Sequence, residues 1–474
     1  MSKKSLKTNF IYNLSVQIIS LLAPFLISPY VSRTITVNGV GRFSNTYANA
    51  SYFILIAMLG TSVYGQREIA SNCNDKAKIS KIFWEVCIVR LLSVAVSLIA
   101  YFSVFSYIGL SKIIIIQSIN ILGVAFDINW FFQGLEEFKV TSVRTMFIKL
   151  GFVVYILIFI KDEQDVELYA LGYALLQVAA NISLWLHVPK YLTKVKPDIR
   201  NMFRHLGPSF LLFVPAMATQ IYTVLDKSMI GIFTDTDVQN GLYEQAEKIS
   251  RISLTVYTAY GTVMAPRIAM LFGEGQKEKI SEYLRNSIKI MWGIVLPLTA
   301  GVFAIAPVFI PWFFGEDFTD AVPILRIFSL LIIPVGLSNV FAVQYLVPVK
   351  KQNVFTVSVI VGAIANFGMN MILIPRYYAI GAAVASVAAE TIITGIQMIY
   401  VVFVCRCFKL RDIFIPSFRY VIYSGIMFLA VYELSLLFAP GLIGSVVIVA
   451  AGIVIYGILL LITKDNLIKS IRKN

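Results

Sequence analysis

The chain consists almost entirely of apolar runs of about 20 residues, separated by short segments that contain charged residues, glycine or proline. The hydrocarbon core of a bilayer is about 30 Å thick, and a helix needs roughly 20 apolar residues to cross it. Because unpaired backbone groups cannot face lipid, such runs must be helices rather than open sheet. With 58% hydrophobic and 14% charged residues, the composition also lies outside the range of soluble globular domains.

Fourteen such runs can be placed along the 474 residues, and no connecting segment is long enough for a separate folded domain. The first run is too long for a cleaved signal and lacks a small-residue cleavage pattern, so we expect it to be retained. The sequence therefore predicts an all-α polytopic membrane protein. The expected spans are 9–33, 44–66, 82–106, 112–132, 143–160, 167–189, 207–233, 243–268, 287–314, 322–347, 354–375, 379–405, 417–438 and 441–463.

The net charge of +14 could indicate a nucleic-acid-binding protein, but the positions of the 40 basic residues argue against it. Most of them lie at the two chain ends and in every second connecting segment, whereas acids such as Asp162 and Glu316 mark the segments between. By the positive-inside rule, both termini are cytoplasmic. The basic stretch 190–204 has no interleaved aromatic platform, so it is expected to anchor the topology and to touch anionic lipid. The basic connecting segments are 67–81, 133–149, 190–206, 273–289, 349–353 and 406–419.

Cysteine and histidine usage gives no sign of a cofactor or an enzyme site. The four cysteines have neither disulfide-framework nor zinc spacing, and the chain has only two histidines. A membrane enzyme such as a repeat-unit polymerase would need a long outer loop or a buried His-containing site. Neither is evident, so we expect a protein that is not an enzyme and has no bound cofactor.

Weak internal similarity indicates a duplicated architecture. Gly41 matches Gly241 and Arg67 matches Arg267, both at an offset of 200 residues. Two six-helix halves with the same orientation predict a pseudo-twofold axis along the membrane normal, with a cavity between the lobes. The expected lobes are 1–206 and 207–410, and 411–474 adds two further helices and a cytoplasmic tail.

Polar stripes within the spans predict the lining of that cavity. Charge at membrane depth is costly, so basic residues there usually face water. One stripe follows helical spacing down the eighth span, and a second follows the first span. The alternative is helix–helix packing through small and polar residues. The candidate cationic residues are Arg42, Arg90, Lys248 and Arg251, and the candidate polar face is Asn13, Gln17, Thr255 and Thr258.

A third polar group lies in the second half of the chain and has a different chemistry. Oxygen ligands from Asp, Asn and Thr suit a hard cation such as sodium, and a midspan carboxylate is either protonated, paired or part of an ion site. A structural hydrogen-bond clamp is the alternative. The candidate cation-site residues are Asp226, Asn366, Asn370, Glu390 and Thr394.

Four segments, in this order along the chain, resemble the polysaccharide repeat-unit flippases (Wzx type) of the multidrug/oligosaccharidyl-lipid/polysaccharide exporter superfamily. They are GVGRFSNTYANASYFILIAMLGTSVYGQREIA at 39–70, WFFQGLEEFKVTSVR at 130–144, LDKSMIGIFTDTDVQNGLYEQAEKI at 225–249 and GAIANFGMNMILIPRYYAIGAAVA at 362–385. The resemblance implies alternating access between two six-helix lobes. It also implies a cationic cavity for an undecaprenyl-pyrophosphate-linked oligosaccharide, to be used for capsule, O-antigen or exopolysaccharide.

The same resemblance implies a location, an ion and partners. The location is the bacterial cytoplasmic (inner) membrane, and the partners are membrane lipids, a polysaccharide polymerase and glycosyltransferases, with no nucleic acid. Relatives hold sodium at positions similar to Asp226, Asn366, Asn370 and Thr394, where Glu390 can supply charge, so sodium or proton coupling is expected. The alternative is a cation-coupled drug or metabolite antiporter of the same superfamily. An antiporter predicts an acidic or aromatic cavity, whereas the ionisable residues placed deep in these spans are mostly basic.

The charge pattern predicts that the segment 273–289 is cytoplasmic. A single cysteine placed at Lys277 in a cysteine-free background should react with a membrane-impermeant maleimide only after the cells are opened. Labelling of that cysteine in intact cells would overturn the topology.

Overall fold

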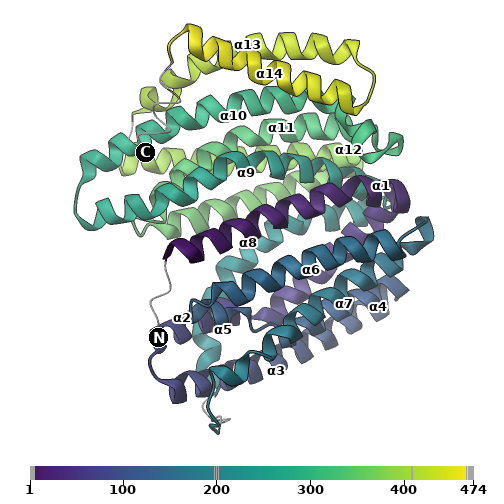
Figure 1. Ribbon diagram of the computed structural model, residues 1–474, viewed down its shortest axis with the longest axis vertical. Coiled ribbons are helices and arrows are strands. Elements are labelled where there is room, and N and C mark those ends of the chain that lie inside the picture. Colours follow the sequence, from purple (N-terminus) through teal and green to yellow (C-terminus); the bar gives the residue numbers. More distant parts are fainter. Residues whose placement is uncertain are drawn as a thin grey trace. The chain divides into compact units, whose positions relative to one another are not determined.

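The computed structural model describes the backbone from Leu6 to Leu467, apart from residues 197, 199, 201, 407, 408 and 466. Side chains are described from Phe25 onwards, apart from those same residues and 214–216, 218, 219, 221, 222 and 256. The chain divides into two compact units, Met1–Ser228 and Met229–Asn474. The described part is helical throughout and contains no strand, which confirms the predicted all-α class (Figure 1).

The first unit contains seven complete helices and most of an eighth. They are α1 (Leu6–Met58), α2 (Thr61–Ser71), α3 (Lys76–Ile108), α4 (Lys112–Gly123), α5 (Asn129–Gly134), α6 (Phe138–Phe159), α7 (Val166–Trp185) and α8 (Leu206–Phe233). The start of α8 packs against this unit, because a Cβ on Gly60 would collide with the backbone of Ser209 and Phe213. The unit boundary thus falls within α8, while the lobe boundary at 206/207 stays a prediction.

The second unit contains the remaining helices. They are α9 (Val238–Gly273), α10 (Lys277–Phe314), α11 (Ala321–Ser338), which continues as the π-helical segment η6 (Asn339–Leu346), α12 (Gln352–Ile399), α13 (Leu410–Leu437) and α14 (Leu442–Ile462). The last two correspond to the two extra C-terminal helices expected from the sequence.

Ten helical segments of the described chain are long and apolar enough to cross a membrane. Two of them, 25–71 and 352–404, include a long helix with one non-helical residue inside it, Thr36 (φ 61°) in α1 and Tyr378 (φ 53°) in α12. The segment 25–71 also has a turn at Leu59 and Gly60, between α1 and α2. The chain folds back at Tyr378, and the two parts of α12 lie side by side: the Gln397 amide donates to the Ser358 hydroxyl (3.0 Å). Each broken segment therefore corresponds to two of the predicted spans, and α8 and α9 correspond to two more. The sequence predicted loops at both breaks, but one residue in a left-handed or strained conformation is sufficient.

A buried acid on α3 fixes the segment between α7 and α8 to the first unit. The Glu85 carboxylate is fully buried and lies 2.8 Å from both the Arg204 guanidinium and Nε2 of His205, and it accepts from the backbone N–H of Asp198 (3.2 Å). Nδ1 of His205 in turn lies 2.6 Å from the hydroxyl of Tyr64. A buried carboxylate is tolerated only when it is paired in this way. The sequence interpretation did not anticipate this network.

Prolines shape the core of the second unit. Pro297 and Pro307 of α10 lack the N–H that would bond the carbonyl four residues earlier. The freed carbonyl of Gly293 accepts the Tyr456 hydroxyl from α14 (2.8 Å), and the freed carbonyl of Phe303 accepts Nε of Arg326 (3.4 Å). Hydrogen bonds thus join α10 to its neighbours where proline interrupts its own ladder.

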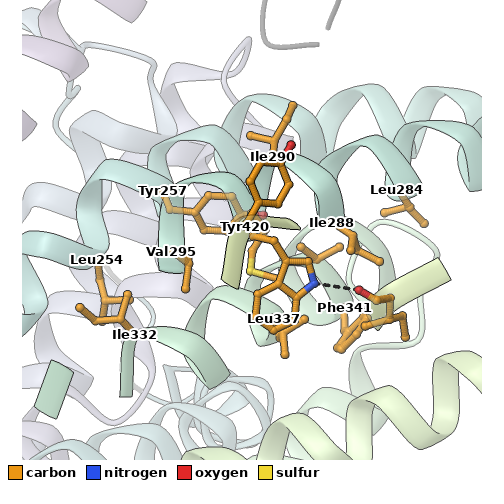
Figure 2. Packing of buried hydrophobic residues seen from close by; sticks show 14 of the residues in the cluster. Leu254, Tyr257, Leu284, Ile288, Ile290, Val295, Ile332, Leu337, Phe341 and Tyr420 are labelled. Carbon is orange, nitrogen blue, oxygen red and sulfur yellow. Dashed lines mark hydrogen bonds between the residues drawn. The ribbon is translucent and has the colours of Figure 1, made fainter. Parts of the chain in front are cut away.

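The same core joins α9, α10, α11 and α13. Figure 2 shows Tyr257, Val295, Leu337 and Tyr420 from these four helices within one buried cluster. The indole N–H of Trp292 adds a hydrogen bond to the carbonyl of Ile413 (2.8 Å). Burying apolar side chains that fit together is the main stabilising contact between these helices.

Asp465 connects the last two helices, α13 and α14. It lies just beyond α14 and accepts from the Arg419 guanidinium (2.8 Å) and the Tyr420 hydroxyl (3.1 Å), both on α13. Burial raises the pKa of the Asp465 carboxyl, but these hydrogen bonds and one from the backbone of Leu467 hold the pKa below its usual value. The carboxylate therefore stays ionised and keeps α13 and α14 together.

Candidate functional site

The polar stripe predicted on the eighth span lies on α9, away from that helix's core face. Ser250, Leu254 and Tyr257 face the core of the second unit and are buried. Lys248, Thr255 and Thr258 are half-buried, and Arg251 is exposed. Since α9 corresponds to the predicted span 243–268, a polar face left accessible by its own unit would need water or a polar ligand there.

Arg251, the most exposed member of this stripe, has a partner that sequence reasoning missed. Its Nε and Nη2 donate to Oε1 of Glu247 at 2.8 and 2.6 Å, and the Arg251 side chain is 57% exposed. Glu247 precedes Arg251 by four residues, which is a spacing that favours helical ion pairs and could have been recognised. The exposed guanidinium is therefore oriented by an acid on the same helix but remains within reach of an anion.

Arg90 has a different environment from the cavity surface predicted for it. The side chain is 1% exposed and packs near the indole of Trp130. Its donors bond Thr61 Oγ1, Ser62 Oγ and the carbonyl of Asp127, and the Asp127 carboxylate lies 3.7 Å away. These groups contact all three nitrogens of the buried guanidinium, so Arg90 is a structural cation and not part of an accessible surface. The sequence could not show this, because an arginine within a predicted span has the same sequence pattern whether it is buried among other helices or lines a cavity.

Arg42 lies near the start of α7 and is half-exposed. Its Nη2 contacts Oε1 of Glu167 at 3.2 Å. Beside it, four aromatic rings pack edge to face and form an apolar cluster. They are Phe43, Tyr47, Tyr169 and Tyr173. Arg42 therefore belongs to the end of its unit opposite the Glu85 network. Asn13 and Gln17 lie on α1, but their side chains fall outside the described residues.

The candidate cation-site residues separate into groups. Asp226 belongs to the first unit and is buried, whereas the other four belong to the second. Asn366 and Asn370 are fully buried one turn apart on α12, and Nδ2 of Asn370 donates to Oδ1 of Asn366 (3.1 Å). Their carboxamide oxygens are hard ligands in a dry site, which is the chemistry that sodium requires. Glu390 is half-buried on the returning part of α12.

Thr394 lies at a different level from the two asparagines. Its hydroxyl donates to the carbonyl of Pro334 on α11 (2.8 Å). Gly362 packs against Ile393, and the two parts of α12 run in opposite directions, so Thr394 lies at least a turn away from Asn366. The structure therefore places Thr394 in the contact between α11 and α12 and not beside the asparagine pair.

Three comparisons with known proteins address the identity of the chain. Residues 6–272 match the family model described as Polysaccharide biosynthesis protein. A Shigella dysenteriae protein named "Putative O-antigen transporter" is 25% identical over 396 residues, which cover 82% of this chain and 98% of that protein.

Two solved structures share the fold. Lipid II flippase MurJ in an inward closed conformation has a TM-score of 0.72 at 18% identity, covering 97% of this chain and 99% of its own. An inward-facing multidrug resistance MATE family transporter of the MOP superfamily has a TM-score of 0.65 at 14% identity, covering 84% and 98%. The likeness establishes that this chain shares their helical fold.

The two arginines should respond differently to neutral substitution. Arg90→Gln leaves buried partners without a cation, so it should lower the free energy of unfolding by about 3–5 kcal/mol. Arg251→Gln removes an exposed ion pair within one helix and should cost only about 0.3–0.5 kcal/mol. Chemical or thermal unfolding of both purified variants in one detergent checks this. Equal destabilisation would contradict the structural role of Arg90.

Proposed function

Because this chain belongs to the Polysaccharide biosynthesis protein family, we propose that it is a flippase for oligosaccharide repeat units. Each unit is linked through pyrophosphate to undecaprenol and crosses the bacterial cytoplasmic membrane, where it serves capsule, O-antigen or exopolysaccharide synthesis. The protein acts as a transporter and not as an enzyme. The O-antigen transporter named above supports this, since it aligns with this chain over nearly its whole length.

The accessible polar face of α9 carries the proposal. Arg251 and Lys248 lie one turn apart on a membrane-spanning helix whose opposite face is buried in its own unit. A guanidinium binds phosphate oxygens through two parallel hydrogen bonds, and an ammonium adds a point charge. In the proposed site, the substrate pyrophosphate competes with Glu247 for Arg251. The threonines that continue the stripe offer hydroxyls to sugar hydroxyls.

Alternating access provides the transport cycle. A substrate moves a two-state equilibrium only if it binds one state more tightly than the other. In the proposal, the pyrophosphate binds to the conformation in which Lys248 and Arg251 both contact it. It is released in the conformation in which Arg251 pairs with Glu247 again. The termini are cytoplasmic, and glycosyltransferases and a polysaccharide polymerase supply and consume the substrate.

A drug or metabolite antiporter is the second candidate. Two observations favour it: Glu247 beside Arg251 makes this part of α9 less cationic, and the aromatic cluster beside Arg42 suits flat organic cations. The MATE transporter shares the fold. Complementation with a lipid-linked oligosaccharide pathway separates the two candidates, because an antiporter does not restore polymer export.

Arg251→Gln and Lys248→Gln should abolish polymer export in a strain that depends on this gene, with normal protein levels in the membrane. The reason is that a pyrophosphate in a low-dielectric site requires these cations. Arg285→Gln, an exposed arginine on α10, is the matched control and should export normally. Immunoblots of surface polymer and of the protein provide the readouts. Normal export in the Arg251 variant would indicate the packing role instead.

We further propose that Asn366, Asn370 and Glu390 of the second unit bind a coupling cation, sodium or a proton, while Asp226, which belongs to the first unit, stays a sequence prediction. The support is the donor set within this unit: the Glu390 carboxylate and the fully buried carboxamide pair, all on α12. Thr394 is not included because its hydroxyl bonds Pro334. A bound ion biases transport only if the ion prefers one conformation.

Sodium should raise the unfolding temperature of the wild type above the value in potassium, since a ligand that binds only the folded state stabilises it. Glu390→Gln and Asn366→Ala should remove that difference, while Thr394→Ala should retain it. Transport in proteoliposomes with sodium, with potassium alone and across a pH series should follow the same pattern. If stability and transport are indifferent to sodium and protons in every variant, the group is a structural clamp.

A further inference from the structure

A groove with a volume of about 780 Å³ lies between α6 and α7, entirely within the first unit. Along most of its length the wall is apolar and includes Val143, Phe147 and Leu176. The lining positions recur every three or four residues on both helices, so each helix presents one face to the groove. Small residues on α7, Ala179, Ala180 and Ser183, leave the space that the groove occupies.

Cationic side chains gather at one end of this groove. Lys139, Arg144 and Lys190 line it there, together with His187. The only acid among the described lining residues is Glu137, and it accepts a hydrogen bond from the Tyr191 hydroxyl. Burial and that carboxylate raise the pKa of Tyr191 to about 12, so its hydroxyl keeps its proton. The end of the groove is therefore strongly cationic.

Arg144 has donor groups that the described part of the chain leaves unused. Its Nε and Nη1 atoms are buried and have no hydrogen-bond partner there. The carboxylate that attracts it from a distance, Asp127, already pairs with Arg90 at 3.7 Å. Because a buried donor without an acceptor is costly, a guanidinium with two such donors in a groove indicates an anionic ligand.

The position of Arg144 along α6 matches the depth at which lipid headgroups lie in a bilayer. The sequence interpretation assigned Arg144 to a connecting segment, but α6 begins at Phe138, so Arg144 lies about 9 Å along the helix. The apolar part of the groove continues from there toward the membrane interior, and Phe147 beside it is 72% exposed. An anion at this depth with an apolar chain attached fits both parts of the groove.

We propose that this groove binds an anionic phospholipid of the surrounding bilayer, with the lipid phosphate on Arg144, Lys139 and Lys190 and one acyl chain along Phe147 and Leu176. The wall favours a phospholipid over the lipid-linked oligosaccharide. Away from the charged end, Ser183 is the only polar side chain among the described lining residues, so an attached oligosaccharide would find few partners. The site is separate from the α9 stripe, and its test does not depend on the transported substrate.

Native mass spectrometry of the purified, delipidated full chain tests the proposal with phosphatidylglycerol, phosphatidylethanolamine and undecaprenyl phosphate as probes. The wild type should bind phosphatidylglycerol about tenfold more tightly than phosphatidylethanolamine. Both lipids offer a phosphate to Arg144, but phosphatidylethanolamine also carries an ammonium group, which the cationic end of the groove repels. Arg144→Gln should lose that preference, and Arg285→Gln should keep it.

A second variant tests the acyl-chain part without removing charge. Ala179→Phe fills the groove from an exposed position and should weaken phosphatidylglycerol binding severalfold, whereas Ala95→Phe, at an exposed position on α3, should not. Unchanged phosphatidylglycerol binding in both groove variants would overturn the proposal. So would tighter binding of undecaprenyl phosphate that both variants abolish, because the groove would then hold the substrate's lipid.

Discussion

The structure depends on the high cost of charge inside a bilayer. Every charge held there needs a partner, a water-filled surface or a bound ligand. Arg90 has partners, because Thr61, Ser62 and Asp127 contact all three nitrogens of its guanidinium. Glu85 has partners too, and it fixes the segment before α8 in doing so. Arg251 combines a partner with an accessible surface, since Glu247 orients it while more than half of its side chain stays exposed. Arg144 keeps donors that no described group satisfies.

This distinction separates stabilising charges from functional ones. Fully satisfied cations stabilise one arrangement and are costly to remove. Partly satisfied cations exchange partners at little cost, which is what a transporter needs if it is to bind a pyrophosphate on one side and release it on the other. In this account, Glu247 is as important as Arg251, because it determines how readily the guanidinium gives up an anion.

The number and type of helices could be predicted from the sequence because apolar length determines them directly, and most predicted ends lie within about two turns of the observed ones. The exceptions are α10, which begins at Lys277 and not at 287, and the predicted spans 44–66 and 112–132, which are interrupted between α1 and α2 and between α4 and α5. The sequence placed a break at both Thr36 and Tyr378, but it could not show that each break is a single residue, since one unusual φ value has no signature in hydropathy. Among candidate site residues, the α9 stripe was predictable from spacing alone. The burial of Arg90 and the bond from Thr394 to Pro334 were not, because they depend on contacts between distant helices. Glu247 could have been recognised from its four-residue spacing to Arg251.

The central claim is that this chain moves a lipid-linked pyrophosphate oligosaccharide between leaflets. It is tested most directly by reconstituting the purified protein in liposomes with a fluorescent undecaprenyl-pyrophosphate oligosaccharide. Dithionite added outside destroys only the fluorophores in the outer leaflet. The account predicts that fluorescence falls by about half in liposomes without protein or with Arg251→Gln, and almost completely with the wild type. Loss of only half the signal with an active, folded wild type would contradict it.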